Sequence, residues 1–123
     1  MTIKRNRSEV EPEQHPYATV WRLIRRDGPE GVGVGITSFR SDAAAARSAM
    51  EAHDVPEVHY VLSGEGILLE EDRQVRLRVG DAVVTMPGLR HALWATSTEP
   101  LVTVYVAMYS VARPGERPPP ADI

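Results

Sequence analysis

Short apolar runs, rich in β-branched and aromatic residues, recur along most of the chain and are separated by turn residues. They predict strands at residues 17–24, 32–39, 58–62, 66–69, 75–79, 82–86, 91–95 and 101–109. Dipeptides such as Ser63-Gly64 and Gly80-Asp81 mark the turns between them. Many short strands with closely spaced turns predict an all-β fold, built as a sandwich or a barrel.

One segment breaks the strand pattern. Residues 41–47 begin with Ser41 and Asp42, which are good helix N-caps, and continue with a run of alanines. We expect at most a short helix or an ordered loop here. A strand should resume near Ser48, because the residues that follow are needed to line the barrel.

Both ends of the chain lack the strand pattern. Residues 1–16 are polar and contain Pro12 and Pro16, so we interpret them as an N-terminal arm or loop. Residues 112–123 are rich in proline and cannot continue a hydrogen-bonded ladder, so we expect an extended C-terminal tail. A single barrel domain, residues 17–111, is predicted between the arm and the tail.

Composition and charge exclude several classes of protein. The chain has 123 residues, of which 42% are hydrophobic, and this is enough for the core of one domain. A net charge of −3 and scattered basic residues argue against nucleic acid or a membrane surface as a partner. The absence of cysteine excludes a disulfide scaffold and a thiolate metal site. Without a signal peptide or a membrane-spanning run, we expect a cytoplasmic protein.

Residues 51–91 hold the ionisable side chains that the fold would bring together. Glu57 and His59 lie two positions apart in a predicted strand and therefore share a face. His53 precedes a proline bend on the neighbouring strand, and His91 opens a strand after a turn, so both can face the same point. Imidazoles and a carboxylate inside an apolar barrel are suitable ligands for zinc or ferrous iron.

Two segments of this region resemble the paired motifs of the cupin superfamily. The matching positions are Glu57, Tyr60, Val61, Leu62, Gly64 and Gly66 in the first motif, and Gly80, Asp81, Gly88 and His91 in the second. The resemblance is to small single-domain cupins, and it implies a double-stranded β-helix, or jelly-roll barrel. The sequence departs from the family pattern at two places. Glu51 stands where the first histidine of the motif is usual, and His59 stands where an apolar or aromatic residue is usual.

The resemblance implies a metal site in the barrel. We expect His53, Glu57, His59 and His91 to bind a divalent ion, with Glu51 as an alternative ligand. Zinc and iron are the expected ions, and nickel or manganese would also suit these ligands. Glu57 and His59 are also the candidate catalytic residues: His59 is alternatively a general base or a substrate contact, and Glu57 alternatively only hydrogen-bonds to a ligand.

Other chemically capable side chains are assigned structural roles. We interpret Trp21, Trp94, Tyr105 and Tyr109 as pocket wall or core, although a tyrosine hydroxyl that faces the cavity can donate a proton. His15 is part of the polar arm. Arg90, next to His91, is either a solvated loop residue or a group that steers an anionic substrate.

These features predict a metal-dependent enzyme that acts on a small organic molecule. Lewis-acid catalysis combined with proton transfer suits a cyclisation, isomerisation, dehydration or lyase step in a biosynthetic or catabolic pathway. Two alternatives stay open, a non-haem iron dioxygenase and a non-enzymatic barrel that binds a small molecule. The resemblance also implies a homodimer, with residues 101–109 and the proline-rich tail as candidate interface segments.

Overall fold

The computed structural model describes residues 2–25 and 31–108. The predicted C-terminal tail, residues 112–123, and the end of the barrel domain at residue 111 lie outside the described residues. Within the described part of the chain, no helix is both long and apolar enough to cross a membrane.

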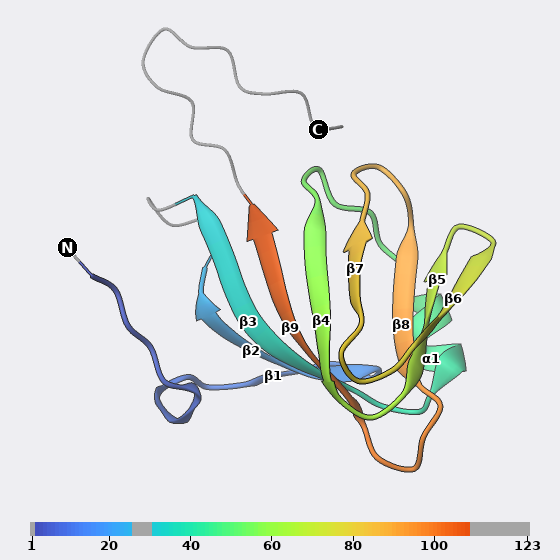
Figure 1. The fold of residues 1–123 in the computed structure, drawn as a ribbon, viewed down its shortest axis with the longest axis horizontal. Helices are drawn as coiled ribbons and strands as arrows, with labels where there is room; N and C mark the ends of the chain where they lie inside the picture. The colour runs from blue at the N-terminus through green and yellow to red at the C-terminus, as the bar shows by residue number, and fades with distance from the viewer. Residues whose placement is uncertain (1, 26–30, 109–123) are drawn as a thin grey trace, which may run out of the picture.

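Two antiparallel sheets face each other and form a barrel (Figure 1). The strands are β1 (Glu13–Gln14), β2 (Ala18–Ile24), β3 (Val32–Phe39), β4 (Glu57–Ser63), β5 (Gly66–Glu70), β6 (Arg73–Leu77), β7 (Ala82–Thr85), β8 (His91–Ala95) and β9 (Leu101–Met108). One sheet has the order β1-β2-β3-β9-β4-β7 and the other β6-β5-β8. The late strand β9 thus lies between β3 and β4, and crossed connections of this kind are typical of jelly rolls. The predicted all-β jelly-roll barrel is confirmed.

The observed strands follow the predicted ones closely, with one offset. Strand β6 begins at Arg73 and ends at Leu77, whereas the apolar pattern placed it at residues 75–79. The hairpin sets this register, because Glu70 pairs with Arg73 directly across the turn. At the other end, the Arg78 N–H donates to the Asp81 carboxylate at 2.9 Å, so the chain is already turning there.

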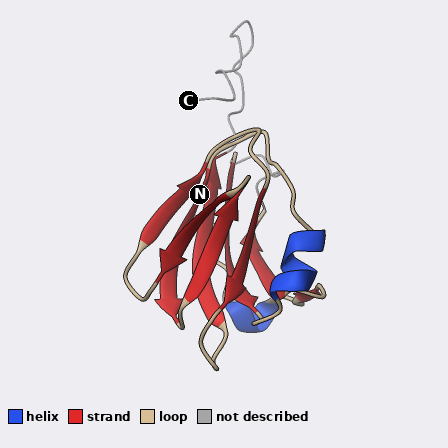
Figure 2. Ribbon diagram, turned by 90° about the vertical axis from the view of Figure 1, so that its right-hand side faces the viewer, coloured by secondary structure: helices blue, strands red, loops and turns tan. Residues whose placement is uncertain are grey.

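The helical segment is short, as expected, and lies outside the second sheet (Figure 2). Helix α1 (Ala43–Ser48) is capped by Asp42, whose carboxylate accepts the Ala45 N–H at 3.0 Å. The expectation that a strand resumes near Ser48 is wrong. The Ser48 hydroxyl donates to the Ala44 carbonyl at 3.0 Å, and the chain then runs as a loop to β4. In the described residues this loop makes one isolated strand-like bridge, from Glu51 to His91.

Part of the predicted N-terminal arm belongs to the larger sheet. After a short 3-10 helix (Arg7–Glu9), strand β1 pairs with β2, so that Glu13 lies opposite Val20. The Arg7 guanidinium lies 5.4 Å from the ring centre of Trp21 and forms a cation–π contact. This contact and an ion pair between Glu13 and Arg22 attach the arm to β2, so the attachment needs no apolar pattern in β1.

The hydrophobic core occupies one end of the space between the sheets. Its fully buried centre includes Val61 and Leu101, which pack with Leu68, Leu77 and Leu93. On β9 the inward positions change in character along the strand, from Leu101 to Thr103 and Tyr105. Polar groups therefore begin where the apolar core ends, and there the barrel contains a cavity.

Candidate metal centre

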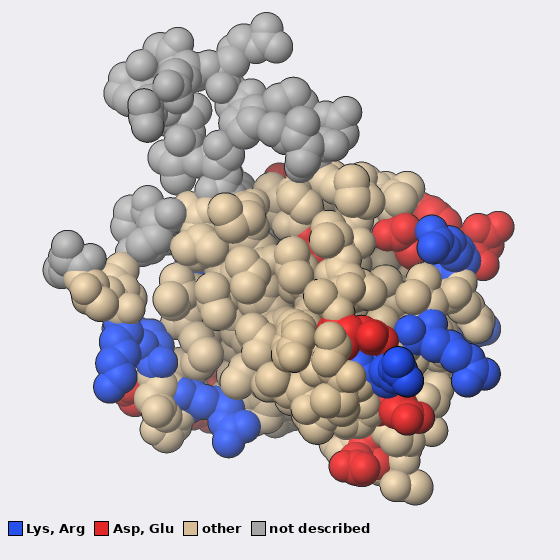
Figure 3. Space-filling model, in the orientation of Figure 1, with Lys and Arg blue, Asp and Glu red and all other residues tan. Residues whose placement is uncertain are grey.

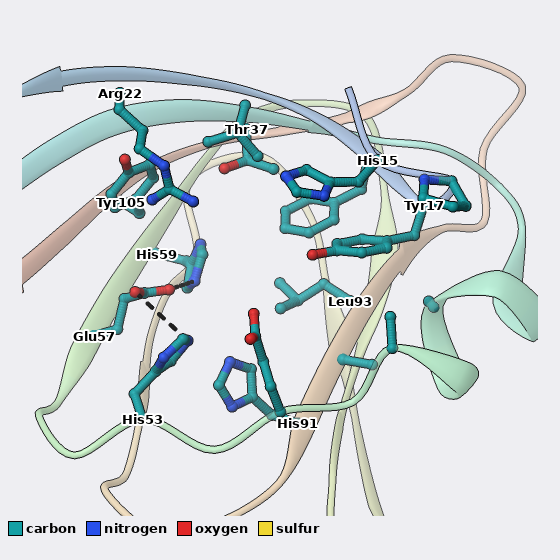
Figure 4. A pocket seen from close by; sticks show the side chains of 17 residues that line it. His15, Tyr17, Arg22, Thr37, His53, Glu57, His59, His91, Leu93 and Tyr105 are labelled. Atoms are coloured by element: carbon teal, nitrogen blue, oxygen red, sulfur yellow. Dashed lines mark hydrogen bonds and ion pairs between the residues drawn. The ribbon is translucent and has the colours of Figure 1, made fainter. Parts of the chain in front are cut away.

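A cavity of about 470 Å³ lies between the two sheets (Figure 4). Strands β2, β3 and β9 form one wall, with Arg22, Thr37 and Tyr105 among the lining side chains. Strand β8 and the loop before β4 form the opposite wall, with His91 and His53. The cavity therefore holds both apolar and ionisable groups, as small-molecule sites usually do.

Three of the four predicted ligands converge at one end of this cavity. One ligand atom each from His53, Glu57 and His91 lies within 4.8 Å of the other two. His53 Nε2 is 3.9 Å from Glu57 Oε2, and the rings of His53 and His91 have centroids 5.0 Å apart. These side chains come from a loop, the start of β4 and the start of β8, so only the folded barrel brings them together.

Backbone hydrogen bonds fix the loop that carries His53. The Gly88 N–H donates to the His53 carbonyl at 2.9 Å, and Gly88 has a φ of +80°, a conformation that favours glycine. Glu51 and His91 exchange two backbone hydrogen bonds, at 3.3 and 3.0 Å. The turn before β8 and the loop before β4 are therefore attached to each other at both histidines.

His59 does not belong to the three-residue cluster. Its Nε2 is 2.8 Å from Glu57 Oε1, and its Nδ1 is 3.0 Å from the Thr103 hydroxyl. The His59 side chain is only 4% exposed. Because a carboxylate only accepts hydrogen bonds, Nε2 carries the proton donated to Glu57. The side chain therefore holds the carboxylate in place. Glu51, the alternative ligand, also lies outside the cluster, although it lines the cavity.

The surroundings of Glu57 and His91 favour the protonation states that metal binding requires. Burial alone would raise the pKa of Glu57, but the hydrogen bond from His59 outweighs it together with the attraction to the His59 and His53 imidazoles, so this pKa lies below its usual value. Burial, together with repulsion from His53, lowers the pKa of His91. An ionised carboxylate and a neutral imidazole are the forms that coordinate an ion.

The cluster fits a divalent ion by its chemistry. Two imidazoles and one carboxylate form a ligand set known from zinc enzymes, and related sets hold iron. Ligand atoms at about 2.0–2.2 Å from one ion lie at most roughly 4.4 Å apart. Small side-chain rotations would close the separations seen here. Three protein ligands also leave coordination positions for water or substrate.

Sequence reasoning missed several side chains that line the cavity. Arg22 lies two positions after the inward-facing Val20 on β2, so a charged residue in an inward position was the available signal. Tyr105 was not missed: it was interpreted as pocket wall or core, it lines the cavity, and burial raises its pKa. His15, assigned to the arm, stacks on Tyr17 with ring centroids 5.4 Å apart, and both line the cavity.

Comparison with known proteins agrees with this architecture. The sequence matches the cupin domain family over residues 40–107, which is more than half of the chain. The chain belongs to the cupin family. No curated protein matches the sequence of this cupin.

Solved structures share the fold of this cupin at low sequence identity. A predicted oxalate decarboxylase from Thermotoga maritima has a TM-score of 0.72 and 18% identity, over 88% of this chain and 100% of that one. FeII HppE has a TM-score of 0.72 and 18% identity, over 87% of this chain and 60% of that one. A histidine-to-glutamine variant of Streptomyces PAC13 with uridine has a TM-score of 0.71 and 16% identity, over 97% and 92% of the two chains. These likenesses describe the fold.

Proposed function

We propose that this cupin is a metal-dependent enzyme that converts a small organic molecule by Lewis-acid and proton-transfer chemistry. The observation that carries the proposal is the convergence of His53, Glu57 and His91 at the end of an otherwise partly apolar cavity. A bound divalent ion would polarise an oxygen atom of the substrate. Cyclisation, isomerisation, dehydration and lyase steps all use this chemistry.

The two oxygens of Glu57 have different tasks in this proposal. Oε1 accepts the hydrogen bond from His59, while Oε2 is the oxygen nearer to His53. Oε2 is therefore the ligand atom that Glu57 offers. His59 is a positioning residue, because its two nitrogens are engaged by Glu57 and Thr103 and it lies behind the carboxylate.

Tyrosine hydroxyls on the cavity wall are the proposed proton donors. Tyr17 and Tyr105 both line the cavity, and burial raises the pKa of each. Both phenols therefore keep their protons at neutral pH and can donate a hydrogen bond or a proton to a developing negative charge on the substrate. In Figure 4 the Tyr17 hydroxyl points toward the middle of the cavity.

Metal content tests the proposal directly. We expect purified protein to hold one divalent ion per chain by elemental analysis, and His91→Ala to lose it, because two ligands hold an ion far more weakly than three. His15→Ala is the matched control, since this imidazole lines the same cavity outside the cluster. Wild-type protein without a stoichiometric ion, or a His91→Ala variant that keeps its ion, would contradict the proposal.

A second test asks whether the bound ion keeps a free coordination position. In cobalt-substituted protein, added azide should change the visible absorption spectrum, because a catalytic site keeps a coordination position free for a small ligand. An unchanged spectrum would indicate a closed structural site. The identity of the native ion, together with oxygen consumption, separates this proposal from the dioxygenase alternative.

A further inference from the structure

The wall opposite the metal cluster carries a cation. Arg22 lies on β2 in the same alternation as the buried residues Ala18 and Val20, so its side chain is directed inward. A register shift follows Arg22 in the pairing of β2 with β3. Figure 4 shows its guanidinium pointing into the cavity beside Tyr105, above His59 and Glu57.

The guanidinium is held on one side by an acidic partner. Its Nε–H donates to the Glu13 carboxylate on β1, and the Tyr105 ring lies beside it in the cavity wall. Gly35 lies opposite Arg22 in the strand register, and a Cβ there would come within 2.5 Å of the Tyr105 ring. The glycine thus makes room for the tyrosine next to the arginine. An arginine has five N–H donors, and the hydrogen bond to Glu13 uses only the one on Nε.

The ion pair with Glu13 leaves the guanidinium of Arg22 able to bind a second anionic group from the cavity. The side chains of Arg22 and Glu13 are 40% and 46% exposed, so water screens this ion pair. The terminal nitrogens of the guanidinium point into the cavity, on the side where a ligand would lie. Their planar, forked arrangement matches the two oxygens of a carboxylate or a phosphate.

We propose that Arg22 binds an oxyanion group of the substrate, with the Tyr105 hydroxyl beside it. The substrate class is a small organic molecule with a carboxylate or phosphate at one end and an oxygen that reaches the metal cluster at the other. The second half of this statement rests on the proposed function, whereas the oxyanion site does not need the metal.

The first test compares ligands that have one or two charged ends. Zinc-loaded protein is titrated by calorimetry with malonate, succinate, glutarate and adipate, and with their monomethyl esters. We expect at least one diacid to bind more tightly than its ester, and Arg22→Gln to lose about 10- to 100-fold of that affinity, as for charge-assisted hydrogen bonds. 3-Phosphonopropionate in the same titration distinguishes a phosphate-type site from a carboxylate site.

Two control variants separate ligand binding from a purely structural role. Arg73→Gln removes an exposed arginine on β6 and should leave every affinity unchanged. Glu13→Gln removes the partner charge but keeps an acceptor for Nε. If Arg22 only attaches β1 to the barrel, Glu13→Gln and Arg22→Gln behave alike. If Arg22 binds the oxyanion, Glu13→Gln keeps or increases the affinity.

A second readout does not depend on the metal. In metal-free His91→Ala protein, the Arg22 Nε–Hε signal in a nitrogen–proton NMR spectrum, assigned by its loss in Arg22→Gln, should shift and saturate on addition of succinate or inorganic phosphate. A signal that moves in protein without bound metal supports the oxyanion site and leaves the metal question separate. An unmoved signal, or equal diacid affinities in wild type and Arg22→Gln, would overturn the inference.

Discussion

At the scale of single residues, the Glu57 carboxylate depends on a buried chain of hydrogen bonds. The Thr103 hydroxyl contacts Nδ1 of His59, and Nε2 of His59 contacts Oε1 of Glu57. Thr103 is fully buried and His59 nearly so, which leaves little freedom for either group to move. The chain from β9 through β4 therefore fixes which oxygen Glu57 turns toward His53 and His91.

Removing the middle of this chain should weaken metal binding without abolishing it. We expect His59→Phe to lower zinc affinity by about 10- to 100-fold, the usual effect of removing a hydrogen-bond partner of a ligand. His59→Gln keeps an amide donor and should restore part of the loss. Competition with a chromophoric chelator measures both. An affinity equal to that of wild type, or a loss as complete as in His91→Ala, would show that His59 has a different role.

The buried phenols predict a pH dependence of stability. The pKa values of Tyr17 and Tyr105 are raised in the folded protein by burial, relative to about 10 in an unfolded chain. Their contribution to stability is therefore complete below about pH 10 and is lost as the pH rises through the folded values. Urea unfolding between pH 8 and 11 should show this decline, and Tyr105→Phe should reduce it. An equal decline in the variant would contradict the assignment.

Residue chemistry was predictable where spacing and motif agreed. The turn before His91 and the positions of His53 and Glu57 led to the expectation that these groups meet, and the structure brings them together. His59 shares the face of Glu57, as the two-residue period requires, but its ring reaches back to the carboxylate. Which neighbour an inward side chain contacts depends on β9, a strand far away in the sequence. The two-residue alternation along β4 shows which side chains point inward, but it does not show which neighbour each of them contacts.

At the scale of elements, strands were predictable because alternation and turns are local signals. The loop before β4 was not predictable, since distant partners order it. The Gly88 N–H donates to the His53 carbonyl, and Glu51 and His91 exchange backbone hydrogen bonds. The same holds for β1, whose two polar residues join the sheet through β2. Long-range pairing explains why His53 sits on an ordered loop where a strand was expected.

Close contact between β2, β3 and β9 makes Gly35 sensitive to substitution. A Cβ at this position would lie 2.4 Å from the Trp21 carbonyl oxygen and 2.5 Å from the Tyr105 ring. We expect Gly35→Ala to lower the free energy of unfolding by about 1–3 kcal/mol, as other overpacked sites do. Denaturant unfolding gives this value, and oxyanion binding beside the displaced Tyr105 should also weaken.

Gly80→Ala is the matched control for this substitution. Gly80 has a φ of +93°, and among the described residues other than its chain neighbours no atom lies within 4 Å of the place that a Cβ would take, so the cost of about 1 kcal/mol comes from the backbone alone. Ligand binding should be unchanged in this variant. A Gly35→Ala protein as stable as wild type, with normal binding, would contradict the close packing around Tyr105.

At the scale of the whole molecule, the outer face of the larger sheet is unusually apolar. Tyr60 and Leu62 on β4 are each 46% exposed, and Val84 on the adjacent β7 is 50% exposed. Figure 3 shows that charged side chains gather at the margins, whereas the middle of the face over β3, β9 and β4 is almost free of them. A sheet face exposed to water normally carries polar residues, so this one is suited to a second apolar surface.

We therefore propose that two copies of this cupin associate through this face. A second copy offers the same uncharged surface, which a self-complementary twofold contact requires. Sedimentation velocity should show a dimer, and the double variant Leu62→Lys and Val84→Lys should shift it to a monomer with its metal content unchanged. Gln74→Lys, on the exposed side of β6, is the control. A wild-type monomer at micromolar concentration would contradict the proposal.

Anomalous diffraction at the absorption edge of the bound ion tests the central claim most directly. We predict a single peak within bonding distance, about 2.0–2.2 Å, of nitrogen atoms of His53 and His91 and of Oε2 of Glu57. His59 should lie outside that distance and remain hydrogen-bonded to the other carboxylate oxygen. A peak elsewhere in the barrel, or none in protein saturated with zinc, iron, nickel or manganese, would contradict a metal centre built from these three side chains.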